Sequence, residues 1–272
     1  MEILNLNDKE KGSIDYDYFV FSGGECHIKI NQKIIKNTKI VASLRSSEDV
    51  MKLLIATDAI KRNSVGRIEL LIPYVPYARQ DRACNQGEAL SIKVFTDLIN
   101  AQNYDVVTIF DPHSDVTPAL INNCKVQSNH WLVKNVLEAA DSTNSALIIS
   151  PDAGANKKSK DLIKYLGGDL IKCDKTRDTA TGKITGFEVY ADDLKGKDCV
   201  IVDDICDGGG TFIGLAKELK AKNSGDIYLV VSHGIFSKGI PPLIEGGINH
   251  VFTTDSFCEI EDLNLTVFHY GR

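Results

Sequence analysis

Unbroken apolar runs recur along this 272-residue chain, and they constrain its fold more than any other feature. A strand with one solvent-facing side alternates apolar and polar residues, whereas a strand covered on both faces is apolar throughout, as in parallel sheets. Five runs are of the second kind: residues 68–72, 106–110, 146–149, 199–202 and 227–231. The sequence therefore predicts mostly parallel sheets with helices on both faces.

Helical patterns lie between these runs. Residues 48–62 carry an apolar stripe and two acidic residues in the first turn, where the helix dipole favours anions. Residues 88–100 repeat the pattern, and the stretches 157–166 and 211–222 each adjoin glycines. Strand–helix alternation of this kind predicts an α/β fold. The two expected stripes are Val50, Leu53, Leu54, Thr57 and Ile60, and Leu90, Val94, Leu98 and Ile99.

Each half of the chain contains an apolar strand that runs directly into acidic residues, at 109–111 and at 201–204. Domains average roughly 150 residues, so the length suits two modest domains. We therefore expect two similar domains, residues 1–128 and 129–272. Ligand sites of open parallel sheets lie beyond the carboxyl ends of the strands, which is where these acids stand.

Composition excludes several classes of protein. The 31 basic and 37 acidic residues leave a net charge of −6, which argues against a nucleic-acid partner. No apolar run reaches the roughly 18 residues of a membrane helix, and the first residues lack the pattern of a signal peptide. The seven cysteines lack the close, paired spacing of disulfide frameworks and zinc sites. We expect a cytoplasmic protein with reduced cysteines and no membrane partner.

The strongest local motif is residues 200–211, where a strand is followed by carboxylates, three glycines and a threonine that opens a helix. Glycines admit a ligand close to the backbone, and amides at a helix start bind anions. The carboxylates would repel a phosphate unless they bind sugar hydroxyls or magnesium. A phosphorylated ribose suits the whole loop better than a turn with solvated acids does. The candidate residues are Asp203, Asp204, Asp207, Gly208, Gly209, Gly210 and Thr211.

Two motifs mark the first half. In residues 73–82, two prolines and two tyrosines precede Arg79 and Arg82, whose planar guanidinium groups suit phosphate oxygens. On its own this segment also fits a surface loop with ordinary ion pairs. His113 follows a strand between two acids, which favours a phosphate or metal contact over a structural role.

Two more motifs mark the second half. Asp152 ends another strand and repeats the pattern of a carboxylate at a strand end. Residues 174–182 are polar and rich in threonine, and they carry Lys175 and Arg177 between two strands. This composition fits a mobile lid and a plain exposed hairpin about equally.

Taken in order, seven segments resemble the ribose-phosphate pyrophosphokinase family: 21–25, 77–82, 111–113, 150–152, 174–177, 202–211 and 232–236. The resemblance implies two phosphoribosyltransferase-type α/β domains with the active site between them and near a subunit interface of a homo-oligomer. It also implies Mg²⁺-dependent transfer of the pyrophosphoryl group of ATP to the anomeric hydroxyl of ribose 5-phosphate, which releases AMP.

The resemblance further implies roles for individual residues. The first domain would bind ATP, with its adenine held by a neighbouring subunit, and the second would bind the ribose phosphate and carry the lid. His113 and Asp152 would lie at the magnesium and phosphate centre, while Lys175, Arg177 and His113 would act in catalysis. The ATP-binding residues would be Phe21, Glu25, Arg79, Gln80, Asp81 and Arg82. Asp203 and Asp204 would hold the ribose hydroxyls, and residues 207–211 the 5-phosphate.

The chain also departs from the family pattern. Gly23 replaces the usual Asp of the adenine segment, Gly208 the usual Thr of the phosphate loop, and Thr176 a common basic residue. Loss of the threonine at 208 would open room beside the 5-phosphate. The chain ends at Arg272, short of the usual C-terminal helix, so the resemblance carries no implication for allosteric control.

Three alternatives to pyrophosphoryl transfer onto ribose 5-phosphate remain. A 5-substituted ribose such as ADP-ribose would give ADP-ribose pyrophosphate by the same transfer. A non-catalytic regulatory relative would typically have lost the lid cations or loop carboxylates, which this chain retains. A phosphoribosyltransferase acting on a base would have no use for the segments at 21–25 and 79–82.

Overall fold

The computed structural model describes residues 1–7, 12–64, 66–139, 146–177 and 184–270. The chain divides into two compact units, Met1–Gln127 and Ser128–Arg272. Within the described residues, no helix is both long enough and apolar enough to span a membrane.

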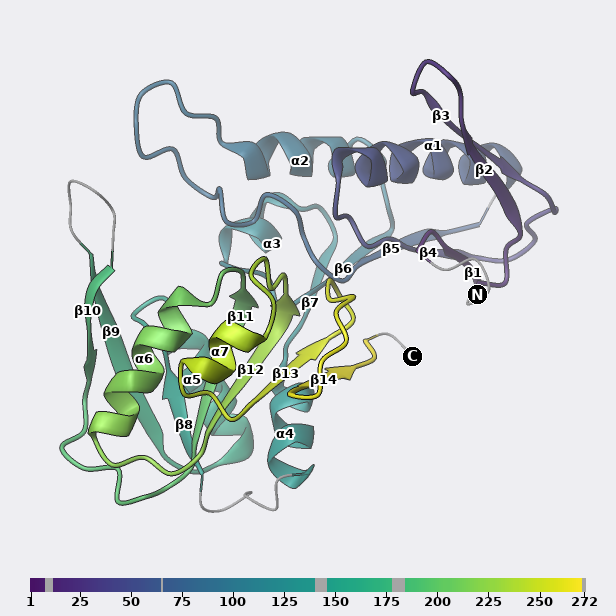
Figure 1. The fold of residues 1–272 in the computed structure, drawn as a ribbon. Helices are drawn as coiled ribbons and strands as arrows, with labels where there is room; N and C mark the ends of the chain where they lie inside the picture. The colour runs from purple at the N-terminus through teal and green to yellow at the C-terminus, as the bar shows by residue number, and fades with distance from the viewer. Residues whose placement is uncertain (8–11, 65, 140–145, 178–183, 271–272) are drawn as a thin grey trace. The chain divides into compact units, whose positions relative to one another are not determined.

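The first unit contains a five-stranded sheet in the order β1-β4-β5-β6-β7, in which every neighbouring pair is parallel. A separate antiparallel hairpin, β2 and β3, extends from it (Figure 1). The strands are β1 (Glu2–Asn5), β2 (Tyr16–Val20), β3 (Cys26–Ile30), β4 (Thr38–Val41), β5 (Ile68–Ile72), β6 (Val106–Phe110) and β7 (Cys124–Gln127). The helices are α1 (Ser47–Asn63), α2 (Ser91–Asn100) and α3 (Val116–Leu120).

The apolar stripe expected for α1 is confirmed, and the one expected for α2 is wrong in part. Ser46 and Asp49 form a capping box at the start of α1, whose buried face follows the expected stripe closely. In α2, however, Val94 and Leu98 are exposed, by 61% and 42%. The helix begins at Ser91 and buries the other apolar face, because that face carries the large ring of Phe95. Its buried residues are Ile92, Phe95, Thr96 and Ile99.

The second unit contains a seven-stranded sheet in the order β10-β9-β8-β11-β12-β13-β14. All neighbouring pairs are parallel except β9 and β10, which form an antiparallel hairpin. The strands are β8 (Leu147–Ser150), β9 (Leu170–Arg177), β10 (Ile184–Val189), β11 (Cys199–Cys206), β12 (Ile227–Gly234), β13 (His250–Thr254) and β14 (Leu265–Phe268). The helices are α4 (His130–Ala139), α5 (Asn156–Leu166), α6 (Gly210–Ala221) and α7 (Pro241–Glu245).

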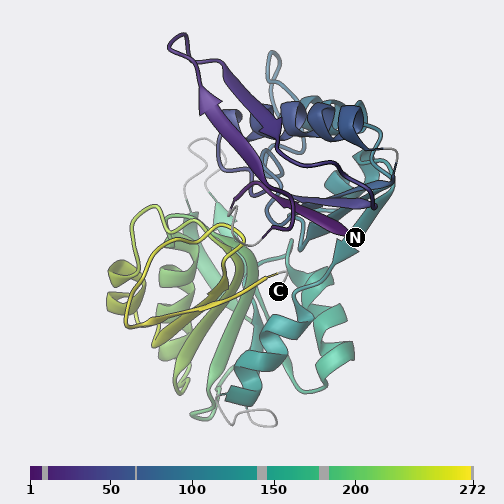
Figure 2. The same cartoon turned by 90° about the vertical axis from the view of Figure 1, so that its right-hand side faces the viewer.

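Helices cover this sheet on both faces, as the unbroken apolar runs predict (Figure 2). Side chains of α6 and α7 pack with Ile149, Ile201 and Leu229 on one face, and those of α4 and α5 pack with Val200 and Val230 on the other. The α/β class and the mostly parallel sheets are therefore confirmed.

The two central strands, β11 and β12, are longer than the apolar runs that predicted them. They stay paired through Asp203 with Val231, Ile205 with His233, and Cys206 with Gly234. Asp203 and Asp204 therefore lie within β11 and not in the loop after it. Backbone pairing continues past the end of each unbroken apolar run, because hydrogen bonds between strands join amides and carbonyls whatever the side chains are.

Candidate active site

The carboxylate pair lies near the carboxyl end of β11. Asp204 is buried, and its backbone amide donates a 2.9 Å hydrogen bond to Oδ1 of Asp203. Burial and then the neighbouring Asp204 carboxylate raise the pKa of Asp203 well above its usual range, with a further contribution from Asp152. Two adjacent carboxyl groups, one of which gains a proton readily, offer both acceptors and a donor to the hydroxyls of a sugar.

The chain then turns into α6 through Asp207, Gly208 and Gly209. Gly209 is the N-cap of α6 in the left-handed conformation, with φ of 76°. A Cβ at this position would lie 2.7 Å from Cδ2 of Leu243 on α7. Both constraints require glycine. The turn at Gly209 places the backbone amides at the start of α6 beside the end of β11, where they can stabilise an anion.

A second loop runs beside the first. After β12, the amides of Ile235 and Phe236 donate to the carbonyl of Cys206 (2.8 and 3.1 Å), and the amide of Ser237 donates to that of Asp207 (3.2 Å). A Cβ at Gly208 would lie 3.6 Å from Cε of Lys238 and 3.8 Å from Oγ of Ser237. The space expected beside Gly208 is therefore bordered on one side by the stem of Lys238.

Asp152 and Lys175 form an ion pair between the end of β8 and the strand β9. Asp152 Oδ2 accepts from Lys175 Nζ, and Oδ1 accepts a 3.0 Å hydrogen bond from the Ala155 amide. Burial by itself would raise the pKa of Asp152, but the Lys175 ammonium and this amide lower it overall. The carboxylate is therefore held ionised. The pair β9–β10 fits the hairpin expected at 174–182, although residues 178–183 and the Arg177 side chain lie outside the described part of the chain.

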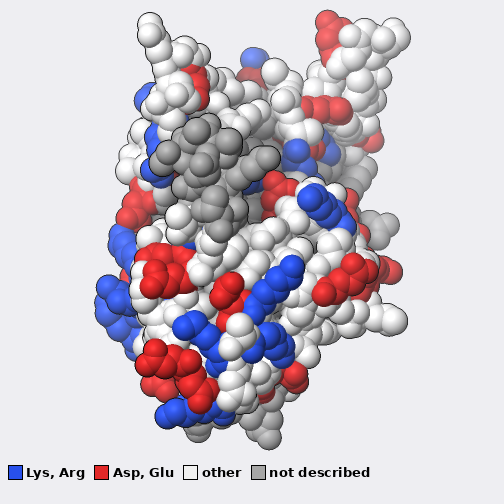
Figure 3. Space-filling model, turned by 60° about the vertical axis from the view of Figure 1, so that its left-hand side comes forward, with Lys and Arg blue, Asp and Glu red and all other residues white. Residues whose placement is uncertain are grey.

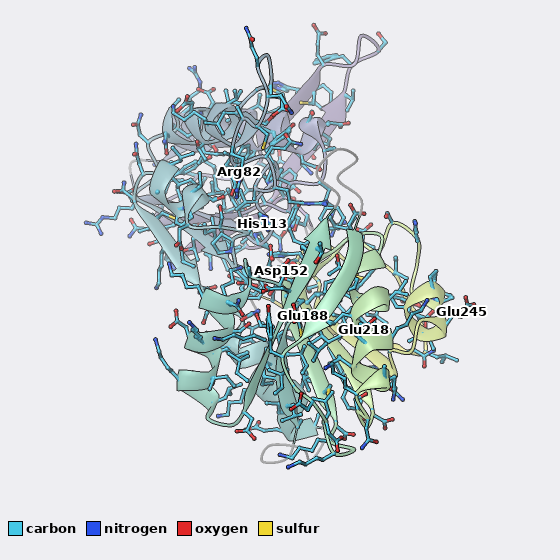
Figure 4. The ribbon with its side chains drawn as sticks, turned by 90° about the vertical axis from the view of Figure 1, so that its left-hand side faces the viewer. Arg82, His113, Asp152, Glu188, Glu218 and Glu245 are labelled. Atoms are coloured by element: carbon cyan, nitrogen blue, oxygen red, sulfur yellow. The ribbon has the colours of Figure 1, made fainter. Side chains whose placement is uncertain are left out.

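In the first unit, Asp81 and Arg82 are a structural pair. The Asp81 side chain is only 4% exposed, and its Oδ1 accepts a 2.9 Å hydrogen bond from Arg82 Nε, which leaves Arg82 74% exposed. Hydrogen bonds from Arg82 and Ser114 lower the pKa of Asp81, with His113 contributing positive charge. Asp81 thus holds the guanidinium of Arg82 outward, in the same unit as the exposed His113 (Figure 4).

The other expected ATP-binding residues are also exposed. Arg79 and Gln80 follow the turn at Tyr77, whose carbonyl accepts from the Gln80 amide at 2.9 Å. Phe21 lies at the tip of the β2–β3 hairpin, and its ring packs edge-on against Phe19 with 4.9 Å between centroids. The Phe21 amide donates to the Glu25 carbonyl at 2.8 Å, which closes the tip. Midway along the hairpin, the Tyr18 hydroxyl donates a 2.7 Å hydrogen bond to Glu48 of α1.

Comparison with known proteins decides the family. Residues 10–102 match the N-terminal domain of ribose phosphate pyrophosphokinase, and residues 183–264 match the phosphoribosyl synthetase-associated domain. The ribose-phosphate pyrophosphokinase of Campylobacter jejuni is 31% identical over 249 residues, which cover 89% of this chain and 79% of that protein. The chain belongs to the ribose-phosphate pyrophosphokinase family.

Further comparisons agree with this assignment. The ribose-phosphate pyrophosphokinase of Ureaplasma parvum is 32% identical over 242 residues, which cover 87% of this chain and 72% of that protein. The fold matches the crystal structure of phosphoribosylpyrophosphate synthetase from Mycobacterium smegmatis with a TM-score of 0.84 at 22% identity, over 99% of this chain and 95% of that one. The chain is therefore an enzyme of the pyrophosphokinase type.

Acidic and basic side chains are interspersed on the face of the molecule drawn in Figure 3. Among the described residues, no cluster of three or more His, Cys, Asp or Glu side chains forms a ready metal site. An ionised Asp152 nevertheless suits magnesium, which typically takes one or two carboxylates and completes its shell with substrate phosphates and water. Asp152 therefore fits the role of one protein ligand of such an ion.

Sequence reasoning missed Ser237 and Lys238. No pattern marks them, because a serine and a lysine after a strand are typical of any loop. Only the hydrogen bonds between the two loops place them beside Gly208.

Proposed function

We propose that the protein transfers the pyrophosphoryl group of ATP to the anomeric hydroxyl of ribose 5-phosphate, forming phosphoribosyl pyrophosphate and AMP. The main support is that two carboxyl groups, Asp203 and Asp204, are followed within a few residues by the backbone amides at the start of α6, in a chain of this family. A sugar that carries an anion matches both ends of the path.

On the acceptor side, Asp203 and Asp204 bind the ribose hydroxyls, and the amides after Gly209 hold the 5-phosphate. These contacts fix the sugar so that its anomeric oxygen faces the β-phosphorus of ATP. That oxygen forms the new bond, the bond from the β-phosphorus to the oxygen bridging the α-phosphate breaks, and AMP leaves with the bridging oxygen. The hydroxyl proton is released. Holding the two reactants in line supplies much of the rate enhancement in such transfers.

On the donor side, Arg79, Gln80 and Arg82 bind the ATP phosphates, and Phe21 and Glu25 contact the adenine. Asp81 serves this site by orienting Arg82, since its own carboxylate is buried. The exposed ring of Phe21 at the hairpin tip suits contact with the adenine of ATP bound to a neighbouring copy in a homo-oligomer.

His113, Lys175 and Arg177 neutralise the charge that spreads over the transferred phosphates. Asp152 and His113 would hold Mg²⁺, which supplies further positive charge at the phosphate oxygens when bound. In the described structure Asp152 is paired with Lys175, so nucleotide and metal binding would redistribute this pair and release the ammonium toward the phosphates.

The alternative acceptor is a ribose with a larger 5-substituent, such as ADP-ribose. It is favoured by Gly208, which lacks the side chain that the family usually places there, and by the lysine that borders the space. Both acceptors use the same transfer, so they differ only in what the loop must accommodate.

The test is product analysis by mass spectrometry after incubation with ATP, Mg²⁺ and each acceptor separately. We expect AMP together with phosphoribosyl pyrophosphate from ribose 5-phosphate, and loss of both in the double variant D203N/D204N. AMP with a pyrophosphorylated ADP-ribose alone would establish the alternative. No AMP with either acceptor would refute the transfer and favour a regulatory relative or a base phosphoribosyltransferase.

A further inference from the structure

We propose that Lys238 is a specificity-determining residue that binds the phosphoryl substituent on C5 of the acceptor ribose. The inference rests on the proposed function, because it assigns a contact to the acceptor side of that site. It follows from the juxtaposition of Lys238 with Gly208, two residues that lie thirty positions apart in the chain.

Position 208 is a glycine although its backbone does not require one. Gly209 must be glycine because of its φ of 76° and its approach to Leu243, but Gly208 is under neither constraint. Its φ is not positive, and a Cβ there would make only ordinary contacts, the nearest at 3.6 Å. The backbone thus tolerates a side chain at 208. What glycine provides is surface on which the Lys238 stem lies, with Cδ at 3.8 Å and Cε at 3.6 Å from the Cβ position.

Hydrogen bonds hold the backbone around Lys238 in place. The three amides of residues 235–237 are hydrogen-bonded to the carbonyls of Cys206 and Asp207, and the Gly239 amide donates to the Phe236 carbonyl at 2.8 Å. Phe236 is buried, and a Cβ at Gly234 would lie only 2.1 Å from its ring. The backbone before Lys238 is therefore tied to residues 206–207, and the backbone after it is tied to Phe236, which leaves the side chain as the adjustable part.

Lys238 also brings a positive charge to this part of the surface. The Lys238 ammonium is one bond beyond Cε and is exposed, and within the described part of the chain it has neither an ion pair nor a hydrogen bond. The loop itself offers an anion only amides and the Thr211 hydroxyl, whose charges are partial. A lysine supplies a full positive charge with three donors on a flexible stem, which suits a phosphoryl group.

The test compares steady-state kinetics of wild type, K238M, K238R and K217M. K238M preserves the length of the side chain and removes its charge, and Lys217 is an exposed lysine further along α6. We expect K238M to raise KM for ribose 5-phosphate about tenfold, the effect of one charge-assisted hydrogen bond near solvent, with kcat and KM for ATP within about twofold. K238R should retain most of the affinity, and K217M should match wild type.

A second variant tests the dependence on Gly208. G208V puts two methyl groups where the Lys238 stem lies, so it should raise KM for the acceptor. In the double variant G208V/K238M, KM for the acceptor should then rise by less than the product of the two single-variant increases. Full independence of the two effects would separate Lys238 from Gly208 and overturn that part of the inference.

The remaining outcomes distinguish this inference from the proposed function. An active wild type with unchanged acceptor KM in K238M would overturn the role of Lys238 and leave the transfer intact. If wild type forms no AMP with any acceptor, the proposed function fails, and calorimetric titration with inorganic phosphate decides the matter for Lys238. Weaker phosphate binding in K238M than in K217M would still support the assignment, and equal binding would overturn it.

Discussion

Gly209 is a position where a single methyl group should be costly for two independent reasons. A non-glycine residue in the left-handed conformation costs about 1–2 kcal/mol. The added Cβ would also lie 2.7 Å from Cδ2 and 3.3 Å from Cγ of Leu243, which is 2% exposed and cannot move away freely. Overpacking of this kind costs about 1–3 kcal/mol, so we expect G209A to lower the free energy of unfolding by about 2–5 kcal/mol.

The chain offers a convenient assay and a matched control for this prediction. Its single tryptophan, Trp131, lies on α4 in the second unit, so fluorescence during urea unfolding reports on the unit that contains Gly209. At Gly210 the φ is not positive and a Cβ meets nothing within 4 Å, so G210A should be nearly neutral. Adding L243A to G209A should relieve the overlap but not the backbone strain. Equal stability of G209A and G210A would refute the reasoning.

Three further predictions concern the site. R177A should lower turnover by about 10³ with little change in affinity for ATP, as expected for a cation that acts on the transition state. F21A should raise KM for ATP several-fold yet leave the melting temperature unchanged, because the ring is 52% exposed. D152N should be less stable than wild type at neutral pH. Since the folded-state pKa of Asp152 is lowered, this difference should shrink as pH falls below about 4, the usual pKa of an aspartate.

Each of these has a contrary result. A change in KM alone for R177A would contradict a lid cation. A higher KM for ribose 5-phosphate but not for ATP in F21A would move the hairpin to the acceptor side. For D152N, a stability deficit that stays constant from pH 7 to pH 3 would show that the ion pair with Lys175 is not its source.

Much of the fold follows from the sequence because burial on both faces of a strand leaves a direct trace in composition. The run at 106–110 coincides with β6, and that at 68–72 with β5. The pattern was less informative for α2, where both Val94 and Phe95 lie on plausible apolar stripes. Only packing against the sheet decides between two such faces, and packing is a property of the whole unit.

The candidate site was predictable to a similar degree. Adjacent acids and glycines mark the segment 203–211 in the sequence. The burial of Asp81 and the pairing of Asp152 with Lys175 depend on neighbours in space, which sequence spacing does not reveal. Position 208 shows the limit most clearly. The sequence shows that a side chain is missing at 208, but it does not show that Lys238 of another loop borders the space.

The three hydrogen bonds between residues 235–237 and the carbonyls of Cys206 and Asp207 tie two loops together that belong to different strand–helix repeats. Insertions or deletions in either loop would break this register, so the two segments must change in concert when substrate preference diverges. Engineering a new acceptor preference into this scaffold would therefore succeed by exchanging both loops as one cassette, and exchange of one loop alone would yield a misaligned site.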